Sequence, residues 1–292
     1  MENLNKILFC FGQGYCANNL VELLSAKGWV CFGSGRTKNS DKIIFDGQTP
    51  IKNFESLAEP VTHILISIPP QNSHGDTVFY HHLKDLYKLS CLKWIGYLST
   101  TGVYGDTSGK KVDESQPTFP SSLRSKRRVE AENNWIEEFQ KNQLPIHIFR
   151  LPGIYGPGRS VFDQLRAGTA KRIIKPGHKF SRIHVDDIVS CLIASMERPS
   201  PGAIYNVCDD HPAAPEEVVT YASKLIETEP PPRIPFELAK LTMTKMALSF
   251  WKDNRTVDNS LIKKELNFKL KYPSYREGLA AIYKNERQLG KR

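Results

Sequence analysis

Short apolar runs alternate along this chain with longer segments in which apolar residues recur at every third or fourth position. The apolar runs predict strands at 6–11, 29–32, 43–45, 62–68, 92–98 and 146–151. The segments with helical spacing predict helices at 18–27, 77–89, 127–141 and 188–196. Because most of the strands are continuous apolar runs, both faces of their sheet must be covered, as in a parallel sheet. The alternation therefore predicts an α/β fold of the Rossmann type, with a doubly wound parallel sheet.

A glycine-rich turn stands between the first predicted strand and the first predicted helix. It reads GQGYCA over residues 12–17, the pattern GxGxxA. Gly12 permits the tight turn, Gly14 lets the backbone approach a pyrophosphate, and Ala17 lets the helix pack close to the sheet. The start of the helix then directs its N–H groups and the positive end of its dipole toward the phosphates. At this place in the alternation the turn predicts a dinucleotide-binding site.

The residues after the second predicted strand indicate which dinucleotide is preferred. A site for NAD usually carries Asp or Glu about 20 residues after the glycines, where it holds the ribose 2′-hydroxyl. No acid is present where this strand ends, at 32–37, and Arg36 and Thr37 stand there instead. An arginine can pair with a 2′-phosphate, which an absent carboxylate does not repel. The sequence therefore predicts NADP in preference to NAD, although Arg36 could also be a surface cation in a loop.

Composition and charge exclude several classes of protein. Among 292 residues, 40% are hydrophobic and 24% charged, which is ordinary for a globular protein. No apolar run reaches the roughly 18 residues of a membrane-spanning helix, and the first one is too short for a signal peptide, so we expect a cytoplasmic protein without a membrane partner. The six cysteines lack CxxC spacing, so no metal site is expected. The formal charge of +9 favours anionic partners, but its dispersal along the chain disfavours nucleic acid.

Six stretches together resemble the extended short-chain dehydrogenase/reductase family, the group of NAD(P)-dependent nucleotide-sugar epimerases and dehydratases. They are GQGYCA, STTGVYGD, RSKRRVEAE, RLPGIYGPGR, RIHVDDI and IYNVCDD, in the family's order. The resemblance implies a Rossmann fold, a nicotinamide dinucleotide cofactor and a small or nucleotide-linked substrate. It also implies that 182–188 borders the substrate site. Asp186 and Asp187 directly precede an apolar helix, and we expect them to cap it.

The resemblance further implies three catalytic positions, a Ser or Thr, a Tyr and a Lys, of which the last two are spaced as YxxxK. The tyrosine of this family is the acid–base group, the lysine holds the nicotinamide ribose and lowers the tyrosine pKa, and the hydroxyl residue orients the substrate. Matched by motif, Thr100 falls on the hydroxyl position and Lys126 on the lysine position. Ser122 stands where the tyrosine is expected. The chain therefore resembles an atypical branch that lacks the YxxxK tyrosine.

These departures weaken the transfer of the family's chemistry to this chain. The hydroxyl of Ser122 has a far higher pKa than a phenol, and its side chain is too short to reach where a phenol oxygen would lie. Tyr104 and Tyr155 could replace it in space, although both lie in turns that belong to the family's structural pattern. Gly153 stands where catalytically standard members often carry an Asn that contacts substrate.

The basic run at 124–128 has two interpretations, a nucleic-acid patch or the start of a helix. Lys126 matches the cofactor-contacting lysine, which leaves the arginines on more exposed faces. Glu130 and Glu132 lie one turn after Lys126 and Arg128, the spacing of neutralising helix pairs. A solvated helix face therefore accounts for the arginines without nucleic acid.

The glycine turn and the resemblance together give a set of expected cofactor contacts. The set consists of Gly12, Gln13, Gly14, Tyr15, Arg36, Thr37, Asp46, Ser67, Lys126 and Pro152. Asp46 could contact the adenine or could simply begin a turn. No metal ligand belongs to the expected site.

The last third of the chain is less informative. A proline cluster at 229–235 precedes the segment 236–251, whose apolar residues have largely helical spacing. That segment could line a substrate cleft, pack as core or join a surface of a homodimer, and core packing is favoured. We expect a nucleotide-binding domain over 1–170, to which 182–210 returns, and a smaller, partly interleaved substrate-binding subdomain over 171–292.

Two functions remain open from the sequence. The first is an NADP(H)-dependent oxidoreductase or epimerase/dehydratase-type enzyme with non-standard proton transfer, which the retained Thr100 and Lys126 favour. The second is a non-catalytic NADP(H)-binding redox sensor, which the missing tyrosine favours.

Overall fold

The central feature of the computed structural model is a seven-stranded sheet in the order β11-β7-β5-β4-β1-β2-β3. Its strands are Ile204–Asn206 (β11), Ile146–Leu151 (β7), Trp94–Thr100 (β5), His63–Ile66 (β4), Ile7–Phe11 (β1), Val30–Gly35 (β2) and Ile43–Ile44 (β3). β1 pairs in parallel with β2 and with β4, and further parallel pairs join β4 to β5 and β2 to β3. From β1 the strand order therefore runs outward in both directions, and the predicted doubly wound sheet is confirmed.

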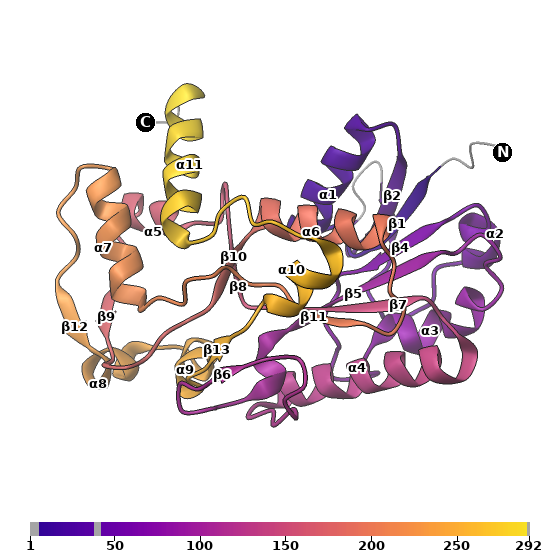
Figure 1. Cartoon of the computed structure of the whole chain (residues 1–292), viewed down its shortest axis with the longest axis horizontal. Coiled ribbons are helices and arrows are strands. Elements are labelled where there is room, and N and C mark those ends of the chain that lie inside the picture. The colour runs from indigo at the N-terminus through magenta and orange to yellow at the C-terminus, as the bar shows by residue number, and fades with distance from the viewer. Residues whose placement is uncertain (1–5, 38–41, 291–292) are drawn as a thin grey trace. The chain divides into compact units, whose positions relative to one another are not determined.

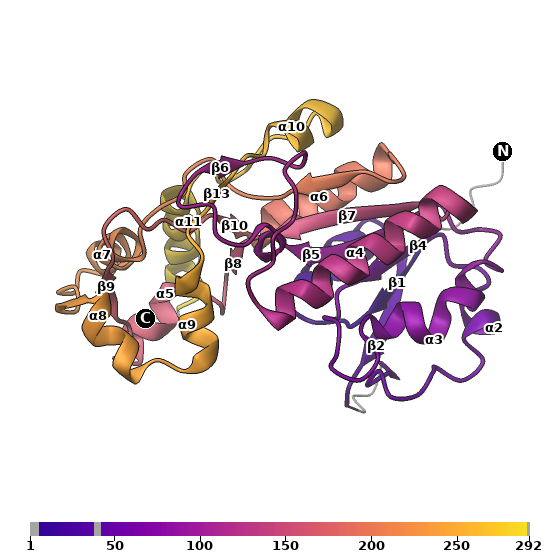
Figure 2. The same ribbon diagram turned by 90° about the horizontal axis from the view of Figure 1, so that it is seen from below.

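Helices cover both faces of this sheet. They are α1 (Tyr15–Ala26), α2 (Phe54–Ala58), α3 (Thr77–Leu86), α4 (Leu123–Asn142) and α6 (Val185–Glu197). Figure 1 shows α1 and α6 on one face and α3 and α4 on the other, and Figure 2, seen from below, shows the face that carries α3 and α4. All four predicted helices are present, and α4 begins at Leu123, earlier than the spacing predicted. Between the layers, buried side chains such as Phe9, Ile64, Tyr97 and Trp135 form one apolar core.

The structure describes residues 6–37 and 42–290, and the chain divides into two compact units. The first unit, which contains the sheet, consists of the chain up to Thr100, of 123–150 and of 189–205. The second consists of 101–122, 151–188 and the chain from Asn206 onward. The expected division near residue 170, into a nucleotide-binding part and a substrate-binding part, stays a prediction, because it depends on what each part binds.

The second unit is built from short elements. Its helices are η1 (Thr101–Tyr104), α5 (Val161–Arg166), α7 (Pro215–Leu225), α8 (Phe236–Ala239), η2 (Lys240–Thr242), α9 (Lys245–Lys252), α10 (Ser260–Leu266) and α11 (Tyr275–Gln288). Its strands are β6 (Lys111–Val112), β8 (Gly153–Tyr155), β9 (Arg172–Ile174), β10 (Arg182–His184), β12 (Arg233–Pro235) and β13 (Thr256–Val257). They form three parallel pairs, β10 with β8, β12 with β9 and β13 with β6. Phe162, Tyr275 and Ile282 belong to a separate apolar core.

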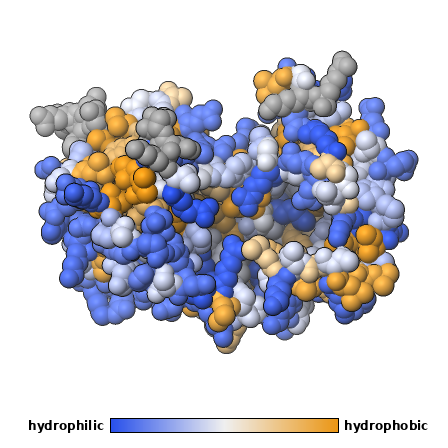
Figure 3. Space-filling view, turned by 180° about the vertical axis from the view of Figure 1, so that it is seen from behind, coloured by the Kyte–Doolittle hydropathy of each residue, from blue (hydrophilic) through white to orange (hydrophobic). Residues whose placement is uncertain are grey.

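The amphipathic segment 236–251 differs from the favoured expectation of core packing. It splits into α8, η2 and α9, so its apolar residues do not share one face. Ala239 and Trp251 are buried, as core packing requires. The expectation of core packing is wrong for four side chains, which are exposed, namely Leu238, Leu241, Met246 and Phe250. On the face drawn in Figure 3, apolar side chains gather in a few patches within a mostly hydrophilic surface. None of the described helices combines the length and apolar character that crossing a membrane requires.

Candidate functional site

A cavity of about 810 Å³ lies at the carboxyl ends of the central strands. The turn after β1, the segment after β2, residues on both sides of β3 and the segment after β4 all line it. Seven of the expected cofactor contacts are among its lining residues, namely Gly12, Gln13, Gly14, Arg36, Thr37, Asp46 and Ser67. In a doubly wound sheet, ligands bind at this edge, beside the point where the strand order reverses. Their contact with a cofactor stays a prediction.

The glycine turn is held by hydrogen bonds to the two neighbouring strand ends. Gly12 has φ +84°, and a Cβ there would overlap the side chain of Ile68. Its N–H donates to Oγ of Ser34 at 3.1 Å, and the N–H of Gln13 donates to the Ser34 carbonyl at 2.8 Å. The Ser67 hydroxyl donates to the Gly12 carbonyl. Because β2 and β4 both fix the turn, only glycine fits at its first position.

The second glycine leaves room above the start of α1. A Cβ on Gly14 would have only the Gly12 carbonyl oxygen near it, at 4.0 Å. Gly14 is the N-cap residue of α1 and makes no side-chain capping bond. Ala17 is fully buried, as close packing of the helix on the sheet requires. The positive end of the α1 dipole therefore lies beside open space, the arrangement that suits a phosphate.

Two cations lie at the rim of this cavity. Arg36 and Thr37 follow β2 and are exposed. Lys42, just before β3, also lines the cavity and donates from Nζ to the Gln13 carbonyl at 2.9 Å. Sequence reasoning missed Lys42, because only the pairing of β3 beside β2 brings it near the glycine turn. Each of these cations could form a charge-assisted bond with a phosphate.

Asp46 forms the turn that the sequence allowed. Its Oδ1 accepts the N–H of Gln48 at 2.9 Å, the pattern of an Asx turn. Its carbonyl accepts Nε2 of Gln71 at 2.7 Å, so this segment is tied to the segment after β4. Contact between Asp46 and an adenine stays a prediction.

The remaining expected site residues lie outside the lining of this cavity. Thr100 ends β5, Lys126 is exposed in the first turn of α4, and Tyr15 begins α1 with its carbonyl accepting Nδ2 of Asn19. Ser122 and Pro152 belong to the second unit. The roles of these residues stay predictions.

The expectation that the arginines of the basic run are exposed is wrong for Arg128. This side chain is buried and donates from Nη1 to the Tyr97 hydroxyl at 2.9 Å and to the Leu98 carbonyl at 2.8 Å. Its guanidinium also lies over the Tyr97 ring. Arg128 lies on the buried face of α4, together with Ser125, Ala131, Glu132 and Trp135, and this face is directed toward β5. Arg128 thus fixes the start of α4, which carries Lys126, against the end of β5.

The expected pairing of Arg128 with Glu132 is also wrong. Glu132 is buried and pairs with Arg150 of β7 at 2.7 Å, and it accepts the Ser99 hydroxyl at 2.5 Å. A buried carboxylate requires such partners, since an unpaired charge in a core costs several kcal/mol, roughly 3–5 when one partner is removed. The network joins α4, β5 and β7 through Ser99, the residue before Thr100.

The two tyrosines considered as replacements for the missing phenol are both held within the second unit. The buried Tyr104 donates its hydroxyl to Oδ1 of Asn206 at 2.8 Å. The Tyr155 hydroxyl donates to the Ser274 carbonyl at 3.4 Å, and burial raises the pKa of Tyr155 above its ordinary value. Both phenols therefore have structural partners in that unit.

The expected helix-capping role of Asp186 and Asp187 is wrong. Both lie in the first turn of α6, where acids suit the helix dipole. Asp187 accepts the backbone N–H groups of Lys271 at 2.6 Å and Tyr272 at 3.1 Å, and Asp186 pairs with Nζ of Lys271 at 2.9 Å. Burial raises the pKa of Asp187 to about 6. The acids thus hold the chain at 271–272 in place.

Metal chemistry receives no support from the described side chains. Within residues 6–37 and 42–290, no group of three or more His, Cys, Asp and Glu side chains is placed to hold a metal ion.

Comparisons with known proteins give relatives over nearly the full chain. The chain is 42% identical to a functionally unknown conserved protein from Silicibacter pomeroyi DSS, with a TM-score of 0.85 over 96% of this chain and 99% of that one. It is 27% identical to the protein YeeZ of Escherichia coli (strain K12) over 282 residues, which are 90% of this chain and 94% of YeeZ.

A dTDP-glucose 4,6-dehydratase from Bacillus anthracis, solved in complex with NAD, has a TM-score of 0.76 at 19% identity over 97% of each chain. At this identity the likeness shows the fold. No family model matches the chain.

Proposed function

We propose that the chain belongs to the extended short-chain dehydrogenase/reductase family and that it is an NADP(H)-dependent oxidoreductase or epimerase/dehydratase-type enzyme. The substrate class is a small or nucleotide-linked molecule. The observation that carries the proposal is the cavity beside the glycine turn, with Arg36 and Lys42 at its rim. The free cysteines of the chain fit a reducing compartment such as the cytoplasm.

The residues of the cavity fit the parts of an NADP molecule. The open space over Gly14 and the start of α1 suits the pyrophosphate, because a Cβ there would meet almost nothing. Arg36 and Lys42 suit a 2′-phosphate, and no acid stands directly at the end of β2, where an NAD site usually carries one. The bound dinucleotide supplies hydride transfer.

The catalytic assignment rests on Thr100 and Lys126. Lys126 is exposed at the start of α4, where a long cationic side chain can hold a ribose, and Thr100 ends β5 at the ligand-binding edge of the sheet. The buried contacts of Arg128 hold these two elements together. Because Ser122 replaces the expected tyrosine, the proton comes from water, from the substrate or from another side chain. The expected contacts of Tyr15 and Pro152 belong to the same proposal.

Cofactor preference is tested by titrating the purified protein with NADPH and, separately, with NADH while nicotinamide fluorescence is followed. We expect NADPH to bind more tightly. Arg36→Ala should weaken NADPH binding about tenfold or more, since a bond to a charged group contributes roughly 1.5–3 kcal/mol, and should leave NADH binding unchanged. Lys52→Ala, which removes an exposed lysine outside the cavity, is the matched control. The NADP assignment would be overturned if the parent protein bound NADH as tightly as NADPH, or if Arg36→Ala bound NADPH as tightly as the parent protein does.

A non-catalytic NADP(H) sensor is the second candidate, and the observation that favours it is Ser122 in place of the tyrosine. The two candidates differ in what Lys126→Ala does. For an enzyme, this variant should abolish turnover of a substrate found by screening with NADPH, whereas Ser122→Ala should change turnover little. Turnover that survives Lys126→Ala would sink the catalytic role of Lys126. For a sensor, the amount of a captured partner protein should differ between NADP+ and NADPH. A second copy of this chain is one such partner, and light scattering would show whether a homodimer forms.

A further inference from the structure

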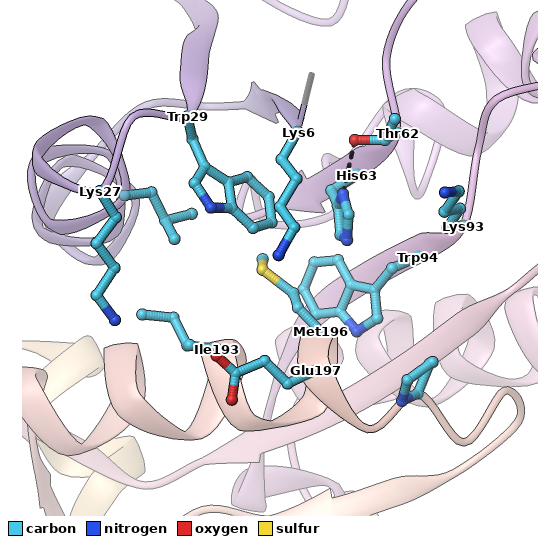
Figure 4. Close-up of a pocket in the computed structure, with 12 residues that line it drawn as sticks. Lys6, Lys27, Trp29, Thr62, His63, Lys93, Trp94, Ile193, Met196 and Glu197 are labelled. Atoms are coloured by element: carbon cyan, nitrogen blue, oxygen red, sulfur yellow. Dashed lines mark hydrogen bonds between the residues drawn. The ribbon is translucent and has the colours of Figure 1, made fainter. Parts of the chain in front are cut away.

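A second cavity lies at the opposite edge of the same sheet, at the amino ends of the strands. Its volume is about 400 Å³, within the size range of small-molecule sites. Lys6 precedes β1, Trp29 precedes β2, His63 begins β4 and Trp94 begins β5, while the C-terminal turn of α6 closes the other side. Figure 4 shows these side chains directed toward one space. Nothing in the proposed reaction uses this edge.

Aromatic rings form one wall of this cavity and are held in fixed orientations. The His63 ring lies between Trp29, at 4.8 Å between ring centroids, and Trp94, at 6.2 Å. Nδ1 of His63 bonds to Oγ1 of Thr62 at 2.8 Å, and Nε1 of Trp94 donates to Oγ of Ser195 at 3.0 Å. Trp94 and His63 are therefore locked, and the half-buried Trp29 offers a flat apolar surface to a ligand.

The charged groups of the cavity give it a positive balance. Its lining includes three lysines, Lys6, Lys27 and Lys93, and a single acid, Glu197. None of these four makes an ion pair with another residue that the structure describes. Lys6 lies over the Trp29 ring at 5.3 Å. Lysines that lie beside an aromatic wall and lack acidic partners are suited to an anion.

We propose that this cavity binds a small anion that carries a flat ring, the chemistry of a nucleoside monophosphate. The ring stacks on Trp29, and the phosphate lies between Lys6 and Lys27, whose side chains end on either side of the space in Figure 4. Glu197 accepts a hydrogen bond from an amino or hydroxyl group of the ligand. A bare inorganic anion would leave the tryptophan wall unused, and a neutral apolar molecule would desolvate the lysines without compensation.

The tryptophans themselves provide a readout that separates this site from the cofactor site. Two of the four tryptophans, Trp29 and Trp94, line this cavity, and no tryptophan lines the cavity beside the glycine turn. The full chain is labelled with ¹⁵N-tryptophan and kept in excess NADP+, and its indole N–H signals are followed while AMP is added. Single Trp→Phe variants assign the four signals.

We expect AMP to shift the Trp29 and Trp94 signals in a saturable way and to leave those of Trp135 and Trp251 in place. Adenosine, which has the ring without the charge, and inorganic phosphate, which has the charge without the ring, should each bind more weakly. The double variant Lys6→Gln with Lys27→Gln should weaken AMP binding about tenfold or more but leave adenosine binding unchanged. Lys52→Gln is the control for loss of an exposed lysine elsewhere in the first unit.

Three results would overturn the proposal. They are a Trp29 signal that does not move with AMP up to about 10 mM, beyond which binding is too weak to be specific, an AMP affinity that is the same in the double-lysine variant, and equal shifts of all four tryptophans. Because the excess NADP+ and the Trp29 readout act at different edges of the sheet, failure of this site leaves the proposed cofactor site untouched, and the reverse also holds.

Discussion

The two edges of the central sheet offer contrasting surfaces to a ligand. At the carboxyl ends of β1 and β2, glycines bring the backbone itself to the cavity, with Gly12 in a left-handed conformation and open space over Gly14. At the amino ends of the same strands, Lys6 and Trp29 present long side chains instead. A site made of backbone atoms depends on the local backbone conformation. It therefore requires particular residue types at adjacent positions in the sequence. A site made of side chains depends on the tertiary fold, and its residues can lie far apart in the sequence.

The largest expected effect is that of Gly12→Ala, which breaks the backbone site. The new Cβ would overlap Ile68, and alanine at φ +84° is strained. Together these costs should lower the free energy of unfolding by about 3 kcal/mol and abolish NADPH binding. Urea unfolding and the fluorescence titration measure the two effects.

Gly14→Ala is the matched control, because its Cβ has only one atom near it, at 4.0 Å. It should change the stability by less than about 1 kcal/mol and still weaken NADPH binding, since the methyl group occupies the space assigned to the phosphates. Unchanged NADPH binding by Gly14→Ala would contradict the backbone site. AMP binding at the opposite edge should be the same in this variant as in the parent protein.

Much of the fold could be predicted from the sequence because its signals are local. The buried strands are continuous apolar runs, and β7 has the predicted limits, Ile146–Leu151. The GxGxxA pattern predicted the turn for the same reason. The segment 236–251 was harder, since helical spacing says nothing about where a helix breaks. Its division into α8, η2 and α9 leaves Leu241 and Phe250 exposed.

The parts of the site that were missed depend on tertiary packing. Arg128 is one of four basic residues between Arg124 and Arg128, and only the phase of α4 and the nearby Tyr97 hydroxyl show that it is buried. Lys42 reaches the glycine turn through strand pairing. The residues that line the cavity at the amino ends of the strands lie in or next to six elements, β1, α1, β2, β4, β5 and α6, between Lys6 and Pro199. No window of the sequence contains enough of them to form a pattern.

A smaller effect is expected on the stability at acid pH, and it depends on His63, which lies at the amino ends of the strands. Burial, with a contribution from nearby lysines, lowers the pKa of His63 from 6.5 to about 4. In the unfolded chain the ring takes up a proton at the higher pH, so the stabilisation is present above pH 6.5 and is lost as the pH falls toward 4. His63→Gln should remove about 2 kcal/mol of this acid-induced loss, after allowance for screening by solvent at an open cavity. Urea unfolding across this window measures it, and an unchanged slope would contradict the buried neutral ring.

The charges of the amino edge should adjust that same window, which sharpens the comparison further. Lys6 and Lys93 both lower the pKa of His63, and Lys6 has the larger effect of the two. Lys6→Gln should therefore raise the pKa of His63 more than Lys93→Gln does, and Lys52→Gln should leave it in place. The ring signals of His63, followed by NMR against pH, report this directly. A bound phosphate neutralises Lys6 much as the substitution does, so AMP should also raise the pKa of His63 in the parent protein. A pKa unmoved by both lysine variants would show that burial alone acts on the ring, and would remove the electrostatic reason to expect an anion at this edge.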